Sequence, residues 1–132
     1  MIIGIGTDII EIARIQKVAQ GTTSFLNKAF TQKEQAYFFK KHYKAETIAG
    51  IFAAKEAISK AFGTGFRSFS LVDIEILPDA LGKPVVTVYN NAKELLTQIG
   101  AREIQVSISH CKEYAVAYAL IERSECNENI SS

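Results

Sequence analysis

A glutamate and a lysine stand one helical turn apart in an alanine-rich stretch, FAAKEAISKAFGTG, at residues 52–65. Glu56 and Lys60 are four residues apart, so they share one face of the helix that this composition predicts. A carboxylate suits Mg²⁺, which binds a few carboxylates with water and phosphate oxygens, and a lysine ammonium suits phosphate. We expect the small side chains of Ala49, Ala53 and Ala57 to leave room for a bulky ligand beside this face. The alternative is an exposed Glu–Lys pair worth roughly 0.2–0.5 kcal/mol.

A second carboxylate, Asp8, lies near the end of an otherwise apolar segment, IIGIGTDII. An ionised carboxylate in apolar surroundings is costly unless it is solvated, paired or bound to a metal. The alternative is a helix N-cap, because Asp at a strand-to-helix junction often accepts backbone N–H bonds. Residue type alone leaves both interpretations open.

Two short motifs carry weaker signals. Gly63-Thr64-Gly65 can present backbone N–H groups to phosphates, but many helices end in the same way, and the Gly-Lys-Ser/Thr ending of a P-loop is missing. Ser109 and His110 end a predicted strand, where a loop can project the histidine. No G-x-S-x-G elbow accompanies them, so a hydrolase triad is not indicated and a structural turn histidine is the alternative.

The helices and strands that must position these residues follow a pattern typical of an α+β fold. We predict a mainly antiparallel sheet with helices clustered in the N-terminal half. Gly4 and Gly6 fall on one face of the first strand, where another backbone can approach closely. Thr31 and Glu34 have the spacing of a capping box. We predict strands at Ile2–Ile10, Phe69–Leu77, Val85–Tyr89, Glu103–Ser109 and Tyr114–Ile121, broken helix over 11–44, and helices at Ala45–Phe62 and from an Asn90 or Asn91 cap to Gly100.

The last strand is apolar on both faces, because Tyr114, Val116, Tyr118 and Leu120 alternate with alanines. A strand of this kind is either covered by helices or packed against another subunit. We favour a subunit interface as a hypothesis.

Charge is distributed unevenly along the chain. Residues 12–44 carry seven basic side chains and one acid, so this segment has a net charge of +6 and the remainder −5. The asymmetry indicates a face that meets an acidic partner, unless these side chains simply form a solvated helical surface. Nucleic acid is a weaker choice of partner, because the basic segment lacks interleaved exposed aromatics and the remainder is acidic.

The length of 132 residues suits one domain, 1–132, with its own hydrophobic core. The apolar runs are too short to span a bilayer, so no membrane partner is expected, and the first residues lack the features of a signal peptide. The two cysteines, Cys111 and Cys126, have no metal-binding or disulfide spacing. We therefore expect a cytoplasmic protein.

Taken together, three stretches resemble the holo-acyl-carrier-protein synthases: GIGTDIIEIARI at 4–15, FAAKEAISKAFGTG at 52–65, and SISHCKEYAVAYALIER at 107–123. DIEILPDALGKP at 73–84 is also similar to that family. The resemblance covers nearly the whole chain, and the Asp and Lys-Glu-Ala motifs together are specific. It implies the 4′-phosphopantetheinyl transferase fold.

This resemblance implies transfer of 4′-phosphopantetheine from coenzyme A to a serine of apo-acyl carrier protein, releasing adenosine 3′,5′-bisphosphate, in fatty acid biosynthesis. It implies a homotrimer with active sites at the subunit clefts, and Mg²⁺ held by Asp8 and Glu56. Glu56 or a metal-bound water is the candidate general base. Further implied roles are phosphate contact by Lys60, nucleotide contact near Gly63, Thr64 and Gly65, coenzyme contact by Ser109 and His110 from a neighbouring subunit, and carrier-protein contact by Arg14.

One position departs from the family pattern. Many relatives have a basic residue just before Phe-Ala-Ala-Lys-Glu, where this chain has Ile51, so we expect Lys44 or Arg67 to make the contacts of that residue here.

Two other functions are compatible with parts of the sequence. One is the same chemistry on a peptidyl carrier, which the short chain disfavours, and the other is a non-catalytic trimeric module that binds acidic proteins through residues 12–44.

Overall fold

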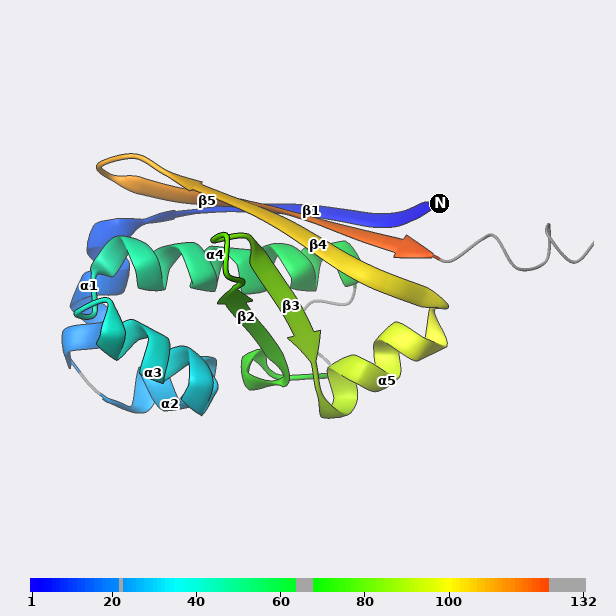
Figure 1. Cartoon of the computed structure of the whole chain (residues 1–132), viewed down its shortest axis with the longest axis horizontal. Coiled ribbons are helices and arrows are strands. Elements are labelled where there is room, and N and C mark those ends of the chain that lie inside the picture. Colours follow the sequence, from blue (N-terminus) through cyan, green and yellow to red (C-terminus); the bar gives the residue numbers. More distant parts are fainter. Residues whose placement is uncertain (22, 64–67, 124–132) are drawn as a thin grey trace, which may run out of the picture.

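Two antiparallel sheets and five α-helices make up the described part of the chain in the computed structural model, which covers residues 1–21, 23–63 and 68–123. The larger sheet has the strand order β1-β5-β4, and β2 pairs with β3 in a separate hairpin. The predicted α+β class with early helices is confirmed (Figure 1). In chain order the elements are β1 (Ile2–Glu11), α1 (Ile12–Gly21), α2 (Thr23–Ala29), α3 (Gln32–Lys40), α4 (Ala45–Phe62), the short 3₁₀ helix η1 (Leu71–Asp73), β2 (Ile74–Pro78), β3 (Pro84–Val88), α5 (Asn90–Gln98), β4 (Ala101–His110) and β5 (Tyr114–Arg123).

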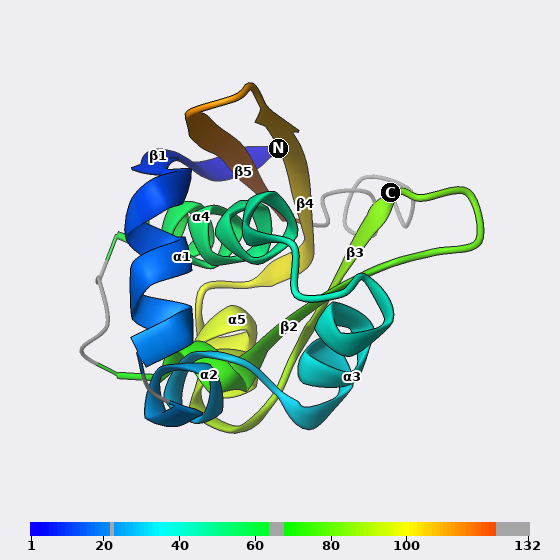
Figure 2. The same ribbon diagram turned by 90° about the vertical axis from the view of Figure 1, so that its left-hand side faces the viewer.

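Helix α4 forms the middle layer of the molecule. Seen from its end, α4 lies between the three-stranded sheet and a layer made of α2, α3, α5 and the β2–β3 hairpin (Figure 2). Five of its alanines are buried, as are three alanines of β5: Ala49, Ala53, Ala54, Ala57 and Ala61 on α4, and Ala115, Ala117 and Ala119 on β5. The core is therefore built around α4, which also carries Glu56 and Lys60.

Glycines on β1 allow the strand to approach α4 closely, as predicted. A Cβ atom at Gly6 would collide with the carbonyl oxygen of Ala57, and one at Gly4 with that of Ala61. The expectation that Ala49, Ala53 and Ala57 leave room for a ligand is wrong, because all three are fully buried in the core. Small side chains on this helix accommodate the backbone of the sheet instead.

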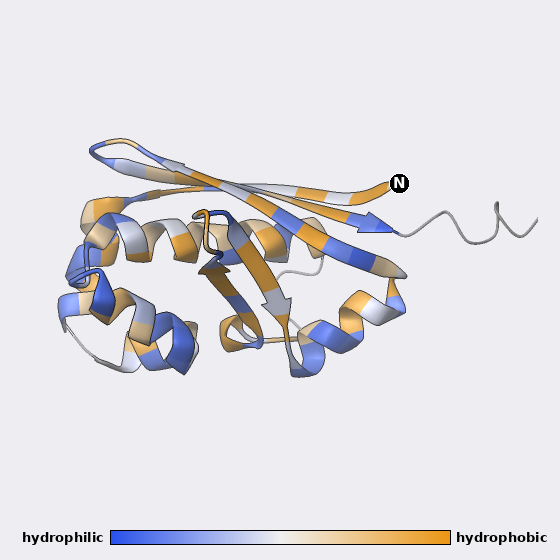
Figure 3. Cartoon of the chain, viewed as in Figure 1, coloured by the Kyte–Doolittle hydropathy of each residue, from blue (hydrophilic) through white to orange (hydrophobic). Residues whose placement is uncertain are grey.

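The outer face of the larger sheet has no cover within the described part of the chain. Ile5, Ile9 and Tyr118 are 58%, 64% and 56% exposed on this face, while alternate residues of the same strands face α4. Apolar residues recur along β1 and β5 (Figure 3). A strand that is apolar on both faces is covered either by helices or by another subunit. For β5, helices cover one face only.

Local signals at the helix ends were partly predicted. The capping box of α3 is confirmed, with Thr31 Oγ1 accepting from Glu34 N–H and Glu34 Oε1 accepting from Thr31 N–H. The Asn cap of α5 is wrong, because Tyr89 holds the N-cap position and Asn90 donates to Asp73 Oδ1. The strand predicted from Phe69 begins only at Ile74, because Ser70 and Asp73 form a capping box that starts η1.

No helix among the described residues is long and apolar enough to cross a membrane.

Candidate active site

Asp8 and Lys60 meet where the edge strand β1 runs past the last turn of α4. Lys60 Nζ lies 3.1 Å from Asp8 Oδ1 and donates to the carbonyl oxygen of Thr7 at 3.1 Å. The Asp8 side chain is only 16% exposed, whereas that of Lys60 is 57% exposed. The N-cap interpretation of Asp8 is wrong, because β1 continues to Glu11 and Asp8 faces α4 from within the strand. Lys60 thus pairs with a carboxylate 52 residues away in the chain.

Glu56 is the second carboxylate of this site. It lies one turn before Lys60 on α4 and is half-buried. Its pKa is raised from the ordinary 4.5, first by burial and then by the negative charge of Asp8, and Lys60 partly offsets the rise. The negative charge of Asp8 raises the pKa of Glu56, and Lys60 donates a hydrogen bond to Asp8. The structure therefore brings together the three side chains that the sequence singled out.

Two neighbouring carboxylates and one ammonium form a site that fits a hydrated divalent cation. No group of three or more His, Cys, Asp or Glu side chains suited to a metal occurs in the part of the chain that the structure describes. A cation at Asp8 and Glu56 would therefore need further oxygen ligands from water or substrate. Mg²⁺ accepts this arrangement, because it usually keeps several waters and binds one or two carboxylates together with substrate phosphates. The cation would also offset the repulsion that raises the pKa of Glu56.

The glycine motif begins at the end of α4. Gly63 has φ +79°, and its N–H donates to the carbonyl oxygen of Lys60 at 3.0 Å, so it forms the left-handed cap of the helix. Its position directly after the turn that carries Lys60 puts it at the same end of α4 as the site. Thr64 and Gly65 lie outside the described residues, as does Arg67.

Ser109 and His110 lie at the opposite edge of the sheet from Asp8. In the register, Ile9 pairs with Val116 of β5, which in turn pairs with Ser109 of β4. Ser109 is exposed on the face away from α4, while Asp8 faces the helix. Two strand spacings of about 4.8 Å separate the edge strands. Within one chain, the structure does not bring Ser109 to Asp8 and Glu56.

His110 borders a cavity between β4, α4, α3 and the β2–β3 hairpin. The cavity has a volume of about 290 Å³ and is bounded by Gly50 and Ile51 of α4, by Pro84 of the hairpin and by Tyr37 of α3. Ile51, which departs from the family pattern, therefore lines this cavity and is 6% exposed. Lys44, the residue before α4, is exposed.

Arg14 is exposed on α1, directly after the strand that carries Asp8. Its neighbour Ile15 is buried, so α1 packs by that side and presents Arg14 outward. The one acid of the basic segment, Glu34, is fully buried and cannot neutralise this surface. All seven basic side chains of residues 12–44 are exposed, so the surface charge of this segment is more positive than its net charge of +6.

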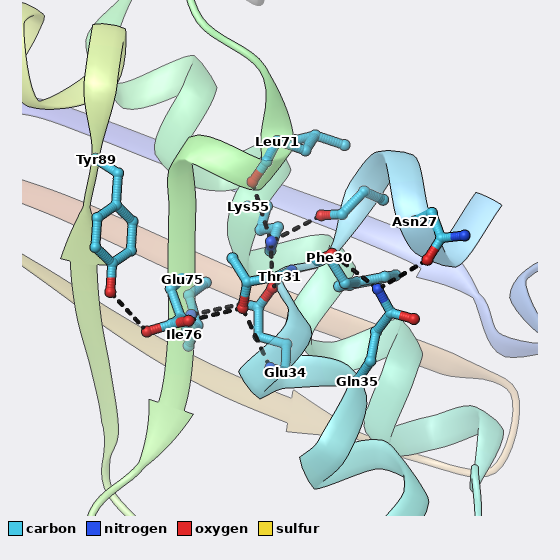
Figure 4. Close-up of polar contacts among 11 residues, drawn as sticks. Asn27, Phe30, Thr31, Glu34, Gln35, Lys55, Leu71, Glu75, Ile76 and Tyr89 are labelled. Carbon is cyan, nitrogen blue, oxygen red and sulfur yellow. Dashed lines mark hydrogen bonds and ion pairs between the residues drawn. The ribbon is translucent and has the colours of Figure 1, made fainter. Parts of the chain in front are cut away.

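The sequence interpretation missed a buried ion pair next to the site. Lys55 Nζ lies 2.6 Å from Glu34 Oε1, and both side chains have no exposed surface (Figure 4). Burial raises the pKa of Glu34 and lowers that of Lys55, and the attraction between the two charges opposes both shifts. The signal in the sequence was a lysine flanked by alanines in an apolar helix, a residue that is almost never fully buried unless paired.

Comparisons with known proteins agree with this geometry. The family model described as the 4′-phosphopantetheinyl transferase superfamily matches residues 4–119. A holo-[acyl-carrier-protein] synthase of Clostridium novyi is 51% identical over 132 residues, covering 98% of this chain and 96% of that protein. The crystal structure of the synthase of Neisseria meningitidis has a TM-score of 0.86 at 34% identity, covering 93% of this chain and 100% of that one.

A structure with bound coenzyme A is also similar. The Helicobacter pylori holo-[acyl-carrier-protein] synthase in complex with coenzyme A has a TM-score of 0.78 at 33% identity, covering 89% of this chain and 99% of that one. The family match includes Asp8 on β1 and all of α4, which hold the site. The chain therefore belongs to the 4′-phosphopantetheinyl transferase superfamily.

Proposed function

We propose that this protein transfers 4′-phosphopantetheine from coenzyme A to a serine of apo-acyl carrier protein, releasing adenosine 3′,5′-bisphosphate, in the cytoplasm and as part of fatty acid biosynthesis. The observation that carries the proposal is the convergence of Asp8, Glu56 and Lys60 in a chain of this family. The relatives are named for this reaction, and one of them binds coenzyme A. Residues 1–132 act as one transferase domain in this proposal.

The reaction is an attack of a serine hydroxyl on the β-phosphate of coenzyme A. Negative charge grows on the phosphoryl and bridging oxygens, so preorganised positive charge is the main requirement of the site. Lys60 supplies one such charge and is held at β1 by two bonds of 3.1 Å, to Asp8 and to the carbonyl oxygen of Thr7. Gly63, Thr64 and Gly65, which follow Lys60 in the chain, are assigned to the nucleotide.

Asp8 and Glu56 would hold Mg²⁺. When bound, the ion supplies charge neutralisation at the pyrophosphate. The serine proton needs an acceptor within hydrogen-bond reach, and Glu56 is the carboxylate assigned to it, because Lys60 already bonds Asp8. Loss of either carboxylate is therefore expected to stop transfer while the fold is retained.

The carrier protein is assigned to the exposed basic surface that includes Arg14. This surface continues from β1, so a carrier docked on α1 would lie close to Asp8. Acidic side chains on the carrier would be attracted to it, chiefly by faster encounter and correct orientation.

A homotrimer completes the site in this proposal. The uncovered apolar face of the larger sheet, with Ile5, Ile9 and Tyr118 more than half exposed, supports a subunit interface. Ser109 and His110 lie across β5 from Asp8, so they would reach the coenzyme only from the partner subunit. Sedimentation at several protein concentrations tests the assembly, and a monomer mass throughout would refute it.

One assay tests the transfer itself. The protein is incubated with coenzyme A, Mg²⁺ and apo-acyl carrier protein, and the carrier is examined by mass spectrometry for the added phosphopantetheine. The wild type is expected to convert the carrier, while Asp8→Ala and Glu56→Ala do not, although circular dichroism finds both folded. Full activity of either variant at limiting Mg²⁺ would exclude the metal assignment. A wild type that binds the carrier without modifying it would favour the non-catalytic module.

A further inference from the structure

Where α4 meets β1, backbone atoms make the closest contacts. On β1, Gly4 and Gly6 lie against the backbone of Ala57 and Ala61, and on β5 three buried alanines and the buried Ile121 line the face toward the helix. Helices resist rotation and sliding chiefly through side-chain ridges that fit into grooves. Close backbone contact sets the distance between α4 and β1, while contacts on the opposite side of α4 are needed to fix its rotation as well.

Lys55 anchors α4 on the opposite side, away from the sheet. Its Nζ donates to the carbonyl oxygen of Ala29 at 2.8 Å, to that of Leu71 at 3.0 Å, and to Glu34 Oε1 at 2.6 Å. A lysine ammonium has three donors, and all three are used here. One atom of α4 is thereby tied to the end of α2, to α3 and to η1.

Glu34 extends the anchor to a fourth segment. Its Oε1 also accepts from Thr31 N–H at 2.9 Å, and its Oε2 accepts from Ile76 N–H of β2 at 2.7 Å. Beyond it, Thr31 Oγ1 donates to Glu75, which accepts from Tyr89 as well (Figure 4). The partners of Lys55 come from different elements, so any rotation of α4 about its axis would break several bonds at once.

A buried ion pair of this kind contributes little to stability by itself. The cost of removing both charges from water is often as large as their attraction, and apolar replacements of the pair are often neutral. What such a pair supplies is a defined geometry, since hydrogen bonds are directional whereas apolar contacts are not. This defined geometry lies next to Glu56, because Lys55 and Glu56 are consecutive residues of one helix.

We propose that the buried Lys55–Glu34 pair positions the active site, by setting the rotation and axial position of α4 at which Glu56 and Lys60 meet Asp8. In an α-helix consecutive side chains point about 100° apart, so Lys55 can be anchored below the sheet layer while Glu56 faces the β1 edge. Lys55 and Glu34 are positioning residues and touch neither substrate nor metal. The inference rests on the proposed function for its activity readout and on the proposed metal site for its Mn²⁺ readout.

The test compares variants in which stability and position are separated. Lys55→Met leaves the buried carboxylate unpaired and is expected to lower the unfolding temperature strongly. The double variant Glu34→Gln/Lys55→Met removes both charges and is expected to recover much of that loss. Ile74→Ala is the matched control, because it weakens the core in β2, where Ile74 is fully buried, and leaves the pair intact. All variants are assayed well below their unfolding temperatures.

Two quantities are measured on each folded variant: kcat for transfer, and the Kd for Mn²⁺ from electron paramagnetic resonance without substrates. In the double variant both should be impaired by about 10- to 100-fold, as for other residues that orient metal ligands. Ile74→Ala should leave both unchanged. Wild-type kcat and Kd in the double variant would overturn the proposal, as would equal losses in Ile74→Ala.

Two further outcomes are separated by the design. If neither variant that carries Lys55→Met folds, Glu34→Gln serves instead, because it keeps Lys55 and both of its carbonyl bonds; weaker Mn²⁺ binding supports the proposal and unchanged binding overturns it. If the wild type binds Mn²⁺ but transfers nothing, the proposed function fails, whereas the positioning role is still decided by the Mn²⁺ affinities.

Discussion

Replacing Gly6 by alanine should disturb both the fold and the site, because the strand that carries Asp8 touches the helix that carries Glu56 at this residue. A Cβ atom at Gly6 would collide with the carbonyl oxygen of Ala57 and lie 2.8 Å from the backbone nitrogen of Ala61. Both neighbours are backbone atoms of α4, so no side chain can turn away. Either β1 or α4 must therefore move.

The magnitude follows from the kind of contact. Inserting a methyl group into a closely packed core typically costs about 1–3 kcal/mol. For a chain of this size, that corresponds to a fall of roughly 3–15 °C in the unfolding temperature. A displacement of about 1 Å at a catalytic group can reduce the rate by about a hundredfold, so transfer should fall more than stability suggests.

The assay for Gly6→Ala combines thermal unfolding by circular dichroism with the rate of carrier modification at a temperature where the variant is folded. Gly21→Ala is the control, since a Cβ atom there has no atom within 4 Å. The control should keep the wild-type unfolding temperature and rate. If Gly6→Ala also keeps both, close contact between β1 and α4 does not determine the geometry of the site.

Three further predictions concern charge and assembly. In the metal-free protein, Asp8→Asn should lower the pKa of Glu56 and Lys60→Met should raise it, as measured by NMR titration, and shifts in the opposite directions would contradict the proposed cluster. Because the pKa of Glu56 is raised in the folded protein, its contribution to stability should be present below about pH 4.5 and be lost as the pH rises through the folded pKa. Arg14→Glu should raise the KM for the carrier and leave the KM for coenzyme A unchanged, and equal changes in both would argue against a docking role. Tyr118→Glu should shift the sedimentation mass to that of a monomer, because a buried unpaired carboxylate is costly, and an unchanged assembly would contradict the interface on this face.

Short-range patterns were the part of the fold that the sequence made predictable. Thr31 and Glu34 have the spacing of a capping box, and α3 begins there. Gly4 and Gly6 alternate on a strand, so their shared face and close contact followed from strand geometry. The helix at Ala45–Phe62 was predicted with its observed ends, because its composition and its terminal glycine agree.

Contacts between distant residues could not be read from spacing. Lys60 was expected to face Glu56 along the helix, but its bonded carboxylate is Asp8, 52 residues away. The Lys55–Glu34 pair joins residues 21 apart on two helices, and no local pattern connects them. Glu34 was predicted only as part of a cap. It has a second role, because its carboxylate accepts from Lys55 Nζ and Ile76 N–H in addition to the N–H of the cap residue.

Some predictions were wrong because one local pattern is compatible with two structural roles. Asn90 was a plausible cap, but it bonds Asp73 and lies inside the first turn of α5. The alanines of α4 suggested space for a ligand, although the same small side chains also allow a sheet to pack closely. Ser109 and His110 were correctly placed at a strand end. Their distance from Asp8 depends on the strand order, which local patterns do not reveal.

Asp8 and Glu56 are proposed to bind one metal ion beside the pyrophosphate of coenzyme A. Crystals grown with coenzyme A and Mn²⁺ test it directly, because the ion gives an anomalous difference peak at a defined position. One peak within coordination distance of both carboxylates and a phosphate oxygen is the predicted result. A peak that contacts only one of the two carboxylates, or bound coenzyme A whose pyrophosphate lies away from both, would contradict it.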